Sequence, residues 1–312
     1  MKEMVVFSGS ANPDLAIRIA EYLNLSVGEM EISRFSEGEI FVRVKQDIRG
    51  RDVFLIQPTC PPPNENMMEL LIIMDAIRRA SSARLTAVLP YFGYARQDRK
   101  DQPRVPITAK LAANVITAAG ADRVLTMDLH ADQIQGFFDI PLDHLFSAPV
   151  FINYLKDLDL KNMVIVTPDV GGIKRARAFA TRLGADLAIV DKRRVNAVNA
   201  EVLHLIGDVK GKTAIIVDDM IATAGSLAEA AKIVHENGAK EIYATAAHGI
   251  LSGPAIERIQ KAPLKELLIT DSIPLDAKKM IPKIKILTVA KLLGEAIRRI
   301  HENESVSSLF ML

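Results

Sequence analysis

The chain has 312 residues, of which 49% are hydrophobic and 25% are charged, and its formal net charge is +1. This length exceeds what one hydrophobic core usually supports, so we expect two domains. The balanced charge excludes the overall basic field that is typical of nucleic-acid and membrane-surface binders, and we expect neither of these partners.

Two further features concern the compartment. Cys60 is the single cysteine, which excludes an intramolecular disulfide and favours a reducing environment. The apolar run in the opening MKEMVVFSGS is far too short for a signal peptide. No run approaches the ~20 apolar residues that a membrane span needs. We therefore expect a cytoplasmic protein.

The predicted elements alternate along the chain. Short apolar runs predict strands at 4–9, 53–58, 85–90, 123–128, 163–168, 186–190, 213–219, 242–248, 266–270 and 285–289. Longer amphipathic stretches predict helices at 13–24, 65–81, 107–119, 171–183, 225–237 and 290–302. Uniformly apolar strands separated by helices are typical of parallel sheets that are covered on both faces. We predict a doubly wound α/β architecture, in which ligands bind at the carboxyl ends of strands.

Each half of the chain carries such a series, and the break falls near FSAPVF (146–151). We predict two similar α/β domains, residues 1–146 and 147–303, followed by a tail at 304–312. Within the first, residues 91–106 are polar, charged and interrupted by two prolines, which predicts a long functional loop.

Three segments of the first half carry candidate chemistry. Residues 34–44 and 94–100 each combine an aromatic side chain with polar groups that could position a base. Asp128 and His130 follow a predicted strand, where an imidazole and a carboxylate could hold a divalent metal or its water shell. A structural histidine is the alternative.

The second half has three strand-to-helix or strand-to-loop junctions of interest. Asp169 follows a strand, and Gly171 and Gly172 give a ligand access to the backbone; a plain loop before a solvated basic helix is the alternative. Residues 191–202 leave a strand with three consecutive cations, which on a mobile loop could close over phosphates. A solvated charge run is the usual explanation of such a segment.

The third junction is IIVDDMIATAGSLAEAA (215–231), where an apolar run ends at Asp218 and Asp219. Adjacent carboxylates repel each other unless a cation or hydroxyl donors satisfy them. The small residues 222–226 leave backbone N–H groups accessible beside a helix N-terminus, which favours an anion. The combination predicts a holder for a vicinal diol beside a phosphate cradle. The alternative is a capped helix with solvated acids.

Several of these segments together resemble the ribose-phosphate pyrophosphokinase family, also called phosphoribosyl pyrophosphate synthetases. The resemblance extends from the first strand to ESVSSLF (304–310) without a large insertion. The motifs that carry it are RFSEGE (34–39), NENMMELLIIMDAIRRASS (64–82), PYFGYARQDRK (90–100), RVPITAK (104–110), DLHADQIQGFFDIP (128–141), PDVGG (168–172), DKRR (191–194) and VDDMIATAGS (217–226).

The resemblance implies two domains of phosphoribosyltransferase type and transfer of the diphosphoryl group of Mg-ATP to the anomeric hydroxyl of ribose 5-phosphate. The first domain would hold the ATP base site and the loop 91–106, and the second would hold the sugar and pyrophosphate loops. Its implied ATP residues are Phe35, Glu37, Gly38, Glu39, Arg96, Gln97 and Asp98. Its implied ribose 5-phosphate residues are Asp218, Asp219, Ala222, Thr223, Ala224, Gly225 and Ser226.

The resemblance also implies catalytic cations, metal contacts and regulation. Lys192 and Arg194 would act on the triphosphate, Asp169, Gly171 and Gly172 would form the pyrophosphate loop, and His130 and Asp169 would contact Mg²⁺. The family forms hexamers from dimers, with phosphate and ADP as effectors, for which Arg104, Ser305 and Ser307 are the candidates.

One departure from the family pattern leaves two rivals open. The family usually has an acid at the position of Ala222 and a threonine at that of Ser226, so the affinity for the sugar could be weakened. A phosphoribosyltransferase would share the acid-pair loop but not require the segments RFSEGE and YARQDRK. A non-catalytic regulatory subunit should have lost cations that this chain keeps.

Overall fold

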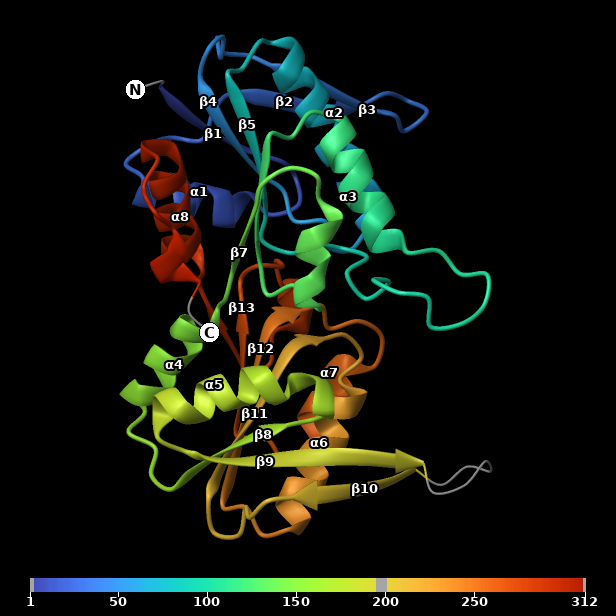
Figure 1. The fold of residues 1–312 in the computed structure, drawn as a ribbon, viewed down its shortest axis with the longest axis vertical. Coiled ribbons are helices and arrows are strands. Elements are labelled where there is room, and N and C mark those ends of the chain that lie inside the picture. Colours follow the sequence, from blue (N-terminus) through green and yellow to red (C-terminus); the bar gives the residue numbers. More distant parts are fainter. Residues whose placement is uncertain (1–2, 195–200, 311–312) are drawn as a thin grey trace. The chain divides into compact units, whose positions relative to one another are not determined.

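The computed structural model describes residues 3–194 and 201–310, with the backbone alone for 192–194 and 201–203. The chain forms two compact units (Figure 1). Unit 1 runs to Phe146 and includes Ser272–Pro274 and the stretch from Thr288, and unit 2 comprises Ser147–Asp271 and Leu275–Leu287. None of the described helices is long and apolar enough to cross a membrane.

Unit 1 is built on a parallel sheet with the strand order β1-β4-β5-β6-β7. Its strands are β1 (Met4–Ser8), β4 (Asp52–Ile56), β5 (Arg84–Leu89), β6 (Arg123–Met127) and β7 (Leu142–Leu145). The helices and the separate antiparallel hairpin are α1 (Pro13–Tyr22), β2 (Met30–Arg34), β3 (Ile40–Val44), α2 (Pro63–Arg79), α3 (Thr108–Ala118), η1 (Asp132–Phe137), α8 (Ala290–Glu302) and η4 (Ser307–Leu309).

Helices cover both faces of this sheet because both faces of its strands are apolar. Val5, Phe7 and Leu55 pack into one core with buried residues of α2 and α3. The alternate residues, among them Val6 and Phe54, are equally buried, and α1 and α8 lie against each other on their side (Figure 1). An isolated parallel bridge joins Val6 to Val27, and β1 is the edge strand of the sheet.

The last helix belongs to unit 1, whereas we expected residues 147–303 to form one domain. Helix α8 packs against α1, and the Tyr22 hydroxyl donates a hydrogen bond to Glu295 over 3.0 Å. His301 Nδ1 lies 2.8 Å from the carboxylate of the buried Asp52 at the start of β4. Sequence periodicity locates such a helix correctly but does not say which sheet its apolar side covers.

Unit 2 has a seven-stranded sheet in the order β10-β9-β8-β11-β12-β13-β14, parallel except for the pair β9 and β10. Its strands are β8 (Met163–Thr167), β9 (Asp186–Arg194), β10 (Glu201–Ile206), β11 (Thr213–Ile221), β12 (Glu241–Gly249), β13 (Glu266–Thr270) and β14 (Ile284–Leu287). Its helices are α4 (Ala148–Asp157), η2 (Val170–Gly172), α5 (Ile173–Leu183), α6 (Gly225–Glu236), α7 (Ala255–Lys261) and η3 (Ala277–Lys279).

The strand order of unit 2 reverses between β8 and β11. Helix α5 leads from β8 to β9 and packs with α4 on Ile165 and Ile215. Helices α6 and α7 cover the opposite face, where Val164 and Ile216 lie in the other core. The connections that leave β8 and β11 therefore diverge to opposite faces, which is the position where open α/β sheets bind ligands.

The doubly wound α/β prediction is confirmed, and the differences concern strand lengths and short elements. The predicted loop at 91–106 lies between β5 and α3 and has no regular structure. The prediction of a loop from residue 191 was wrong, because β9 continues to Arg194 and pairs with β10, Arg194 opposite Glu201. The sequence analysis also missed β2, β3, β7, β10, α4 and α7.

A buried carboxylate joins the carboxyl ends of β1 and β4 in unit 1. Glu69 of α2 is 3% exposed and accepts hydrogen bonds from the backbone N–H and the hydroxyl of Ser10, both over 2.7 Å. Gln57 Nε2 donates to the same carboxylate over 2.9 Å. Gly9 packs so closely on Gln57 that a Cβ at this position would collide with its side-chain amide.

We expect Glu69→Ala to destabilise unit 1 by about 2 kcal/mol, because both Ser10 donors and Gln57 lose this acceptor. Thermal unfolding followed by circular dichroism measures the effect, which corresponds to a Tm lowered by about 4–8 °C for a unit of this size. Asp75→Ala is the matched control, since Asp75 lies on the same helix with an exposed carboxylate paired with Arg79. Equal Tm values for the two variants would contradict the prediction.

Candidate active site

The acid pair lies near the carboxyl end of β11, next to the point where the strand order of unit 2 reverses. Asp219 is 6% exposed, and its Oδ1 lies 3.7 Å from Nη1 of Arg175 in the first turn of α5. The backbone N–H of Asp219 donates to Asp218 Oδ1 over 2.8 Å. Both acids belong to the strand itself, since β11 extends two residues beyond its predicted end to Ile221.

The pair is electrostatically strained. Burial raises the pKa of Asp218 well above its ordinary value, and the neighbouring charge of Asp219 raises it further. The backbone hydrogen bond from Asp219 and the positive charge of Arg175 act in the opposite direction but less strongly. Two carboxylates held in this way gain from a ligand that supplies hydroxyl donors, and a vicinal diol presents two of them.

The segment after the acids forms a bare turn into α6. Ala224 has the left-handed backbone angle φ of +57°, which is uncommon for a residue with a Cβ. Its side chain cannot cap α6, and the helix begins directly at Gly225. Thr223 and Ser226 expose their hydroxyls on either side of this start. A helix N-terminus with accessible N–H groups favours an anion such as a phosphate.

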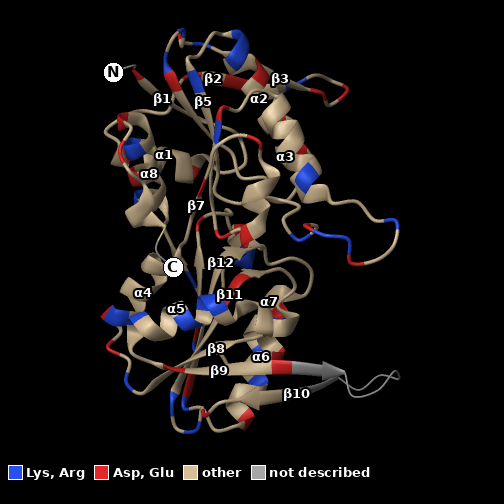
Figure 2. Cartoon of the chain, viewed as in Figure 1, with Lys and Arg blue, Asp and Glu red and all other residues tan. Residues whose placement is uncertain are grey.

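The loop after β8 lies beside this turn, because η2 contacts both β11 and β9. Asp169 Oδ1 accepts a hydrogen bond from Gly172 N–H over 3.0 Å, and the Thr167 hydroxyl donates to the Asp169 carbonyl over 2.7 Å. A Cβ at Gly172 would collide with Thr167 Oγ1, so only glycine fits there. The basic residues that follow lie along α5 (Figure 2). The structure thus brings the predicted pyrophosphate loop next to the predicted sugar loop.

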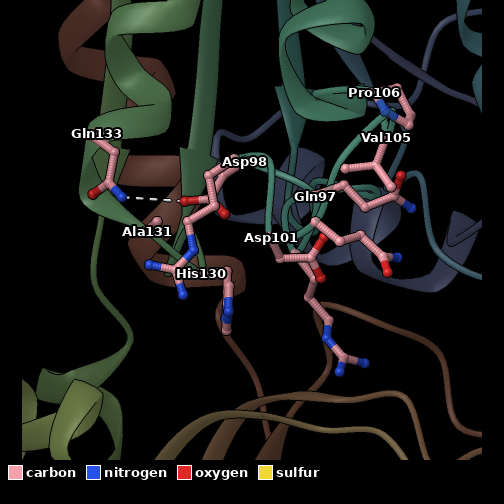
Figure 3. A pocket seen from close by; sticks show the side chains of 11 residues that line it. Gln97, Asp98, Asp101, Val105, Pro106, His130, Ala131 and Gln133 are labelled. Carbon is pink, nitrogen blue, oxygen red and sulfur yellow. Dashed lines mark hydrogen bonds between the residues drawn. The ribbon is translucent and has the colours of Figure 1, made fainter.

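Unit 1 contains a cavity of about 460 Å³ at the loop 91–106 (Figure 3). Gln133 Nε2 donates to Asp98 Oδ2 over 3.1 Å and so connects this loop to η1. The lining residues are Arg96, Gln97, Asp98, Arg99, Asp101, Gln102, Val105, Pro106, His130, Ala131 and Gln133. Three predicted ATP residues and the predicted metal residue His130 therefore line one cavity.

The turn after β6 brings His130 to this cavity. Asp128 is buried with a left-handed φ of +43°, and the Leu129 N–H donates to Nε2 of the buried His144 over 2.9 Å. These contacts direct the chain out of the strand and leave His130 exposed.

The donor set fits a magnesium ion that is carried mainly by its substrate. Within residues 3–194 and 201–310, no group of three or more His, Cys, Asp or Glu side chains is arranged to hold a metal. Mg²⁺ keeps several waters and is commonly bound through one or two carboxylates together with substrate phosphates. His130 in unit 1 and Asp169 in unit 2 are each exposed, so each offers a single contact within its own unit.

The other predicted ATP residues lie in the turn of the β2–β3 hairpin. Phe35 is 51% exposed and packs edge to face against Phe41, with ring centroids 5.6 Å apart. Arg34 Nη1 donates to the Gly38 carbonyl over 3.0 Å, which shapes the turn that also carries Glu37 and Glu39. None of the four predicted residues of this turn lines the cavity at the loop 91–106.

The predicted regulatory residues are exposed and lie apart in the chain. Arg104 has a left-handed φ of +67° within the loop 91–106. Arg299 Nη1 donates to the Ser305 carbonyl over 3.1 Å and to the Ser308 hydroxyl over 2.5 Å. The hydroxyls of Ser305 and Ser307 lie 3.1 Å apart. Helix α8 thus anchors the tail that carries both serines.

One residue that was not predicted contacts the turn before α6, and the side chains of the two predicted catalytic cations are not described. Arg258 of α7, which the sequence analysis did not name, donates to the Thr223 carbonyl over 3.0 Å. It lies 35 residues beyond Thr223, and nothing in its spacing indicates the contact. Lys192 and Arg194 belong to β9, but their side chains lie outside the described residues.

Comparisons with known proteins agree with this geometry. The family model of the N-terminal domain of ribose phosphate pyrophosphokinase matches residues 4–120, and that of the phosphoribosyl synthetase-associated domain matches residues 193–311. The ribose-phosphate pyrophosphokinase of Caldanaerobacter subterraneus subsp. tengcongensis is 58% identical over 98% of this chain and 97% of its own length. That of Campylobacter jejuni is 54% identical over 100% of both chains.

A solved structure extends the similarity to the fold. The crystal structure of phosphoribosylpyrophosphate synthetase from Mycobacterium smegmatis superposes with a TM-score of 0.92 at 41% identity. The match covers 97% of this chain and 100% of that one.

The acid pair generates a prediction about stability and pH. We expect Asp218→Asn to raise the Tm at pH 7 by about 2–4 °C, because it removes a half-buried charge that lies beside the like charge of Asp219. Asparagine keeps the oxygen that accepts the Asp219 N–H. Because the pKa of Asp218 is raised in the folded state, the gain should be present above that pKa and shrink as the pH falls toward the ordinary range of aspartate.

Thermal unfolding between pH 4 and pH 8 in steps of about one unit measures this difference. Asp159→Asn is the control, since Asp159 is an exposed acid of the same unit and asparagine tolerates its left-handed φ of +48°. A pH-independent gain, or a gain of the same size in the control, would contradict the explanation.

Proposed function

Because the chain belongs to the ribose-phosphate pyrophosphokinase family, we propose that it transfers the β,γ-diphosphoryl group of Mg-ATP to the anomeric hydroxyl of ribose 5-phosphate. The anomeric oxygen forms a bond to the β-phosphorus, the bond between the β-phosphorus and the α,β-bridging oxygen breaks, and AMP leaves. The hydroxyl proton is lost in this step, and we assign no residue as its acceptor. The products are phosphoribosyl pyrophosphate, used in nucleotide biosynthesis, and AMP.

The observation that carries the proposal is the junction of β11 with α6. Asp218 and Asp219 accept hydrogen bonds from the ribose hydroxyls, which relieves the mutual repulsion of a half-buried and a buried acid. The turn of Ala222, Thr223, Ala224, Gly225 and Ser226 binds the 5-phosphate through backbone N–H groups and two hydroxyls at the start of α6.

The nucleotide residues belong to unit 1 and the diphosphoryl residues to unit 2. Arg96, Gln97 and Asp98 line the cavity at the loop 91–106, where a guanidinium suits phosphate and the amide and carboxylate suit base or ribose. The exposed ring of Phe35, with Glu37, Gly38 and Glu39, offers a stacking surface for the base. The loop of Asp169, Gly171 and Gly172 binds the diphosphoryl group through its backbone.

Two kinds of positive charge assist the transfer. Transfer of this type needs in-line positioning and neutralisation of charge, with little covalent work by the protein. Mg²⁺, when bound with ATP, neutralises phosphate oxygens, and His130 and Asp169 are the residues that hold its water shell. Lys192 and Arg194 stabilise the charge on the moving group.

The assembly, the compartment and the effectors are proposed from the family to which the chain belongs. We propose a cytoplasmic homo-hexamer built from dimers. Phosphate and ADP act as effectors through Arg104, Ser305 and Ser307, which combine a guanidinium with exposed hydroxyls suited to phosphate. The phosphoribosyltransferase alternative would leave the nucleotide residues of unit 1 without a role, and the regulatory-subunit alternative is an outcome of the following experiment.

The first prediction concerns catalysis. Wild-type protein should form AMP and phosphoribosyl pyrophosphate from Mg-ATP and saturating ribose 5-phosphate, and Lys192→Ala should lower kcat on the order of 100-fold or more. Lys232→Ala is the matched control, because Lys232 lies on the exposed side of α6 and pairs with Glu236. Wild-type protein that binds ATP but forms no product would favour a non-catalytic regulatory subunit.

The second prediction concerns the sugar loop. We expect Ala222→Asp to lower the KM for ribose 5-phosphate about threefold or more, because the acid adds an acceptor beside the sugar hydroxyls. The KM for ATP should stay unchanged, since the nucleotide residues belong to unit 1. Initial-rate kinetics with each substrate varied in turn measure both constants. An unchanged KM for the sugar would show that the residue at position 222 only shapes the turn.

A further inference from the structure

The turn between β11 and α6 lacks side chains that could hold its shape. Ala222 and Ala224 carry only methyl groups, and Ala224 provides no side-chain cap for α6. The left-handed φ of +57° at Ala224 is a conformation that costs on the order of 1 kcal/mol or more for a residue with a Cβ. A strained turn of this kind persists only when the surrounding structure fixes it.

Three hydrogen bonds from one neighbouring segment fix this turn. The Leu251 N–H donates to the Ile221 carbonyl over 3.0 Å, and the Ser252 N–H donates to the Ala222 carbonyl over 2.8 Å. The third bond joins Arg258 Nη1 to the Thr223 carbonyl over 3.0 Å. Three successive carbonyls of the turn are therefore held by residues 251–258, and the last is held by a charged side chain.

Arg258 brings a positive charge to the same place. Its Nη1 lies 3.3 Å from the position that a Cβ of Gly225 would occupy, so the guanidinium adjoins the first residue of α6. Among the described side chains, no carboxylate lies within ion-pair distance of Arg258, whereas its neighbour on α7, Lys261, pairs with Glu257. Arg258 thus adds positive charge beside the first residue of α6, and it also helps Lys261 to lower the pKa of Glu257.

The hydrogen bond also sets the direction of one peptide unit. In a trans peptide the carbonyl and the following N–H point to opposite sides. Because the Thr223 carbonyl points to Arg258, the Ala224 N–H points to the other side of the turn, away from α7. Without the guanidinium this carbonyl would lose its partner, and the peptide could rotate so that the N–H no longer faces the ligand.

We propose that Arg258 is a positioning residue for the 5-phosphate of ribose 5-phosphate. It orients the peptide between Thr223 and Ala224 and adds positive charge beside the N-terminus of α6. This inference rests on the proposed function, because it concerns how the same site holds its sugar phosphate. Arg258 acts through the turn, so its effect should fall on binding of the sugar and not on the chemistry of transfer.

The test compares Arg258→Ala and Arg258→Lys with the wild-type protein by initial-rate kinetics. We expect Arg258→Ala to raise the KM for ribose 5-phosphate about tenfold, with kcat within about twofold and the KM for ATP unchanged. Arg258→Lys should recover part of this loss, because lysine keeps the charge and a donor but lacks the planar fork. Lys261→Ala is the matched control, a cation of the same helix that is bound to Glu257 instead of the turn.

A binding measurement separates positioning from folding. Ribose 5-phosphate should raise the Tm of the wild-type protein, and at the same concentration it should raise that of Arg258→Ala less, while the unliganded Tm values stay within about 2 °C. An unchanged KM for the sugar in Arg258→Ala would overturn the inference, as would equal losses in kcat and in both KM values. Wild-type protein without activity and without a shift by ribose 5-phosphate would instead overturn the proposed function.

Discussion

The reversal of strand order between β8 and β11 is the constraint on which the candidate site depends. The two strands are neighbours, yet the helices that follow them, α5 and α6, pack on opposite faces of the sheet. Neither helix can therefore supply partners for every polar group at both strand ends. At this edge the chain places features that lower stability, namely two adjacent acids, of which Asp219 is buried and Asp218 half-buried, and a left-handed alanine. A bound ligand that relieves the repulsion of the acids and the strain of the turn explains why the chain keeps both features.

In unit 1 the polar groups at the ends of β1 and β4 find their partners within the protein. There the carboxylate of Glu69 accepts the N–H and the hydroxyl of Ser10, donors of the kind that bind a phosphate elsewhere. Gln57 completes the contact, so the edge is satisfied without a ligand. One cavity of this unit lies at the loop 91–106 and His130, and a second, of about 420 Å³, is lined by residues that follow β4 and β5, among them Thr59 and Gly93.

Sequence reasoning succeeded where the pattern itself contains the physics. Parallel strands that are buried on both faces appear in the sequence as apolar runs, and the α/β architecture predicted from them is confirmed. The ligand site that the acids and small residues indicate stays a prediction. Sequence reasoning failed where partners come from distant parts of the chain. The cations at 192–194 suggest a loop, but β10 supplies hydrogen-bond partners that extend β9 through them. Likewise α8 was assigned by proximity in sequence, whereas Asp52 and Tyr22 bind it to unit 1.

The candidate site, too, depends on residues that are distant in the sequence. The cavity of unit 1 joins residues 96–98 to His130, which the sequence places about 30 positions apart and could not connect by spacing. The sequence does not indicate a role for Arg258, because a lone arginine on a short helix is usually a solvated charge.

Residues 251–258 hold the backbone of the turn between β11 and α6, and this bears on the effect of the alanine at position 222. A turn shaped by its own side chains would be distorted by losing the acid that the family usually has at position 222. Here the carbonyls of Ile221, Ala222 and Thr223 are all held by the neighbouring segment, so the backbone does not depend on that side chain. The alanine then alters charge and hydrogen bonding at the site while its geometry is retained. Less negative charge beside a bound phosphate partly offsets the lost acceptor for the sugar, so a moderate change in affinity follows and not an inactive site.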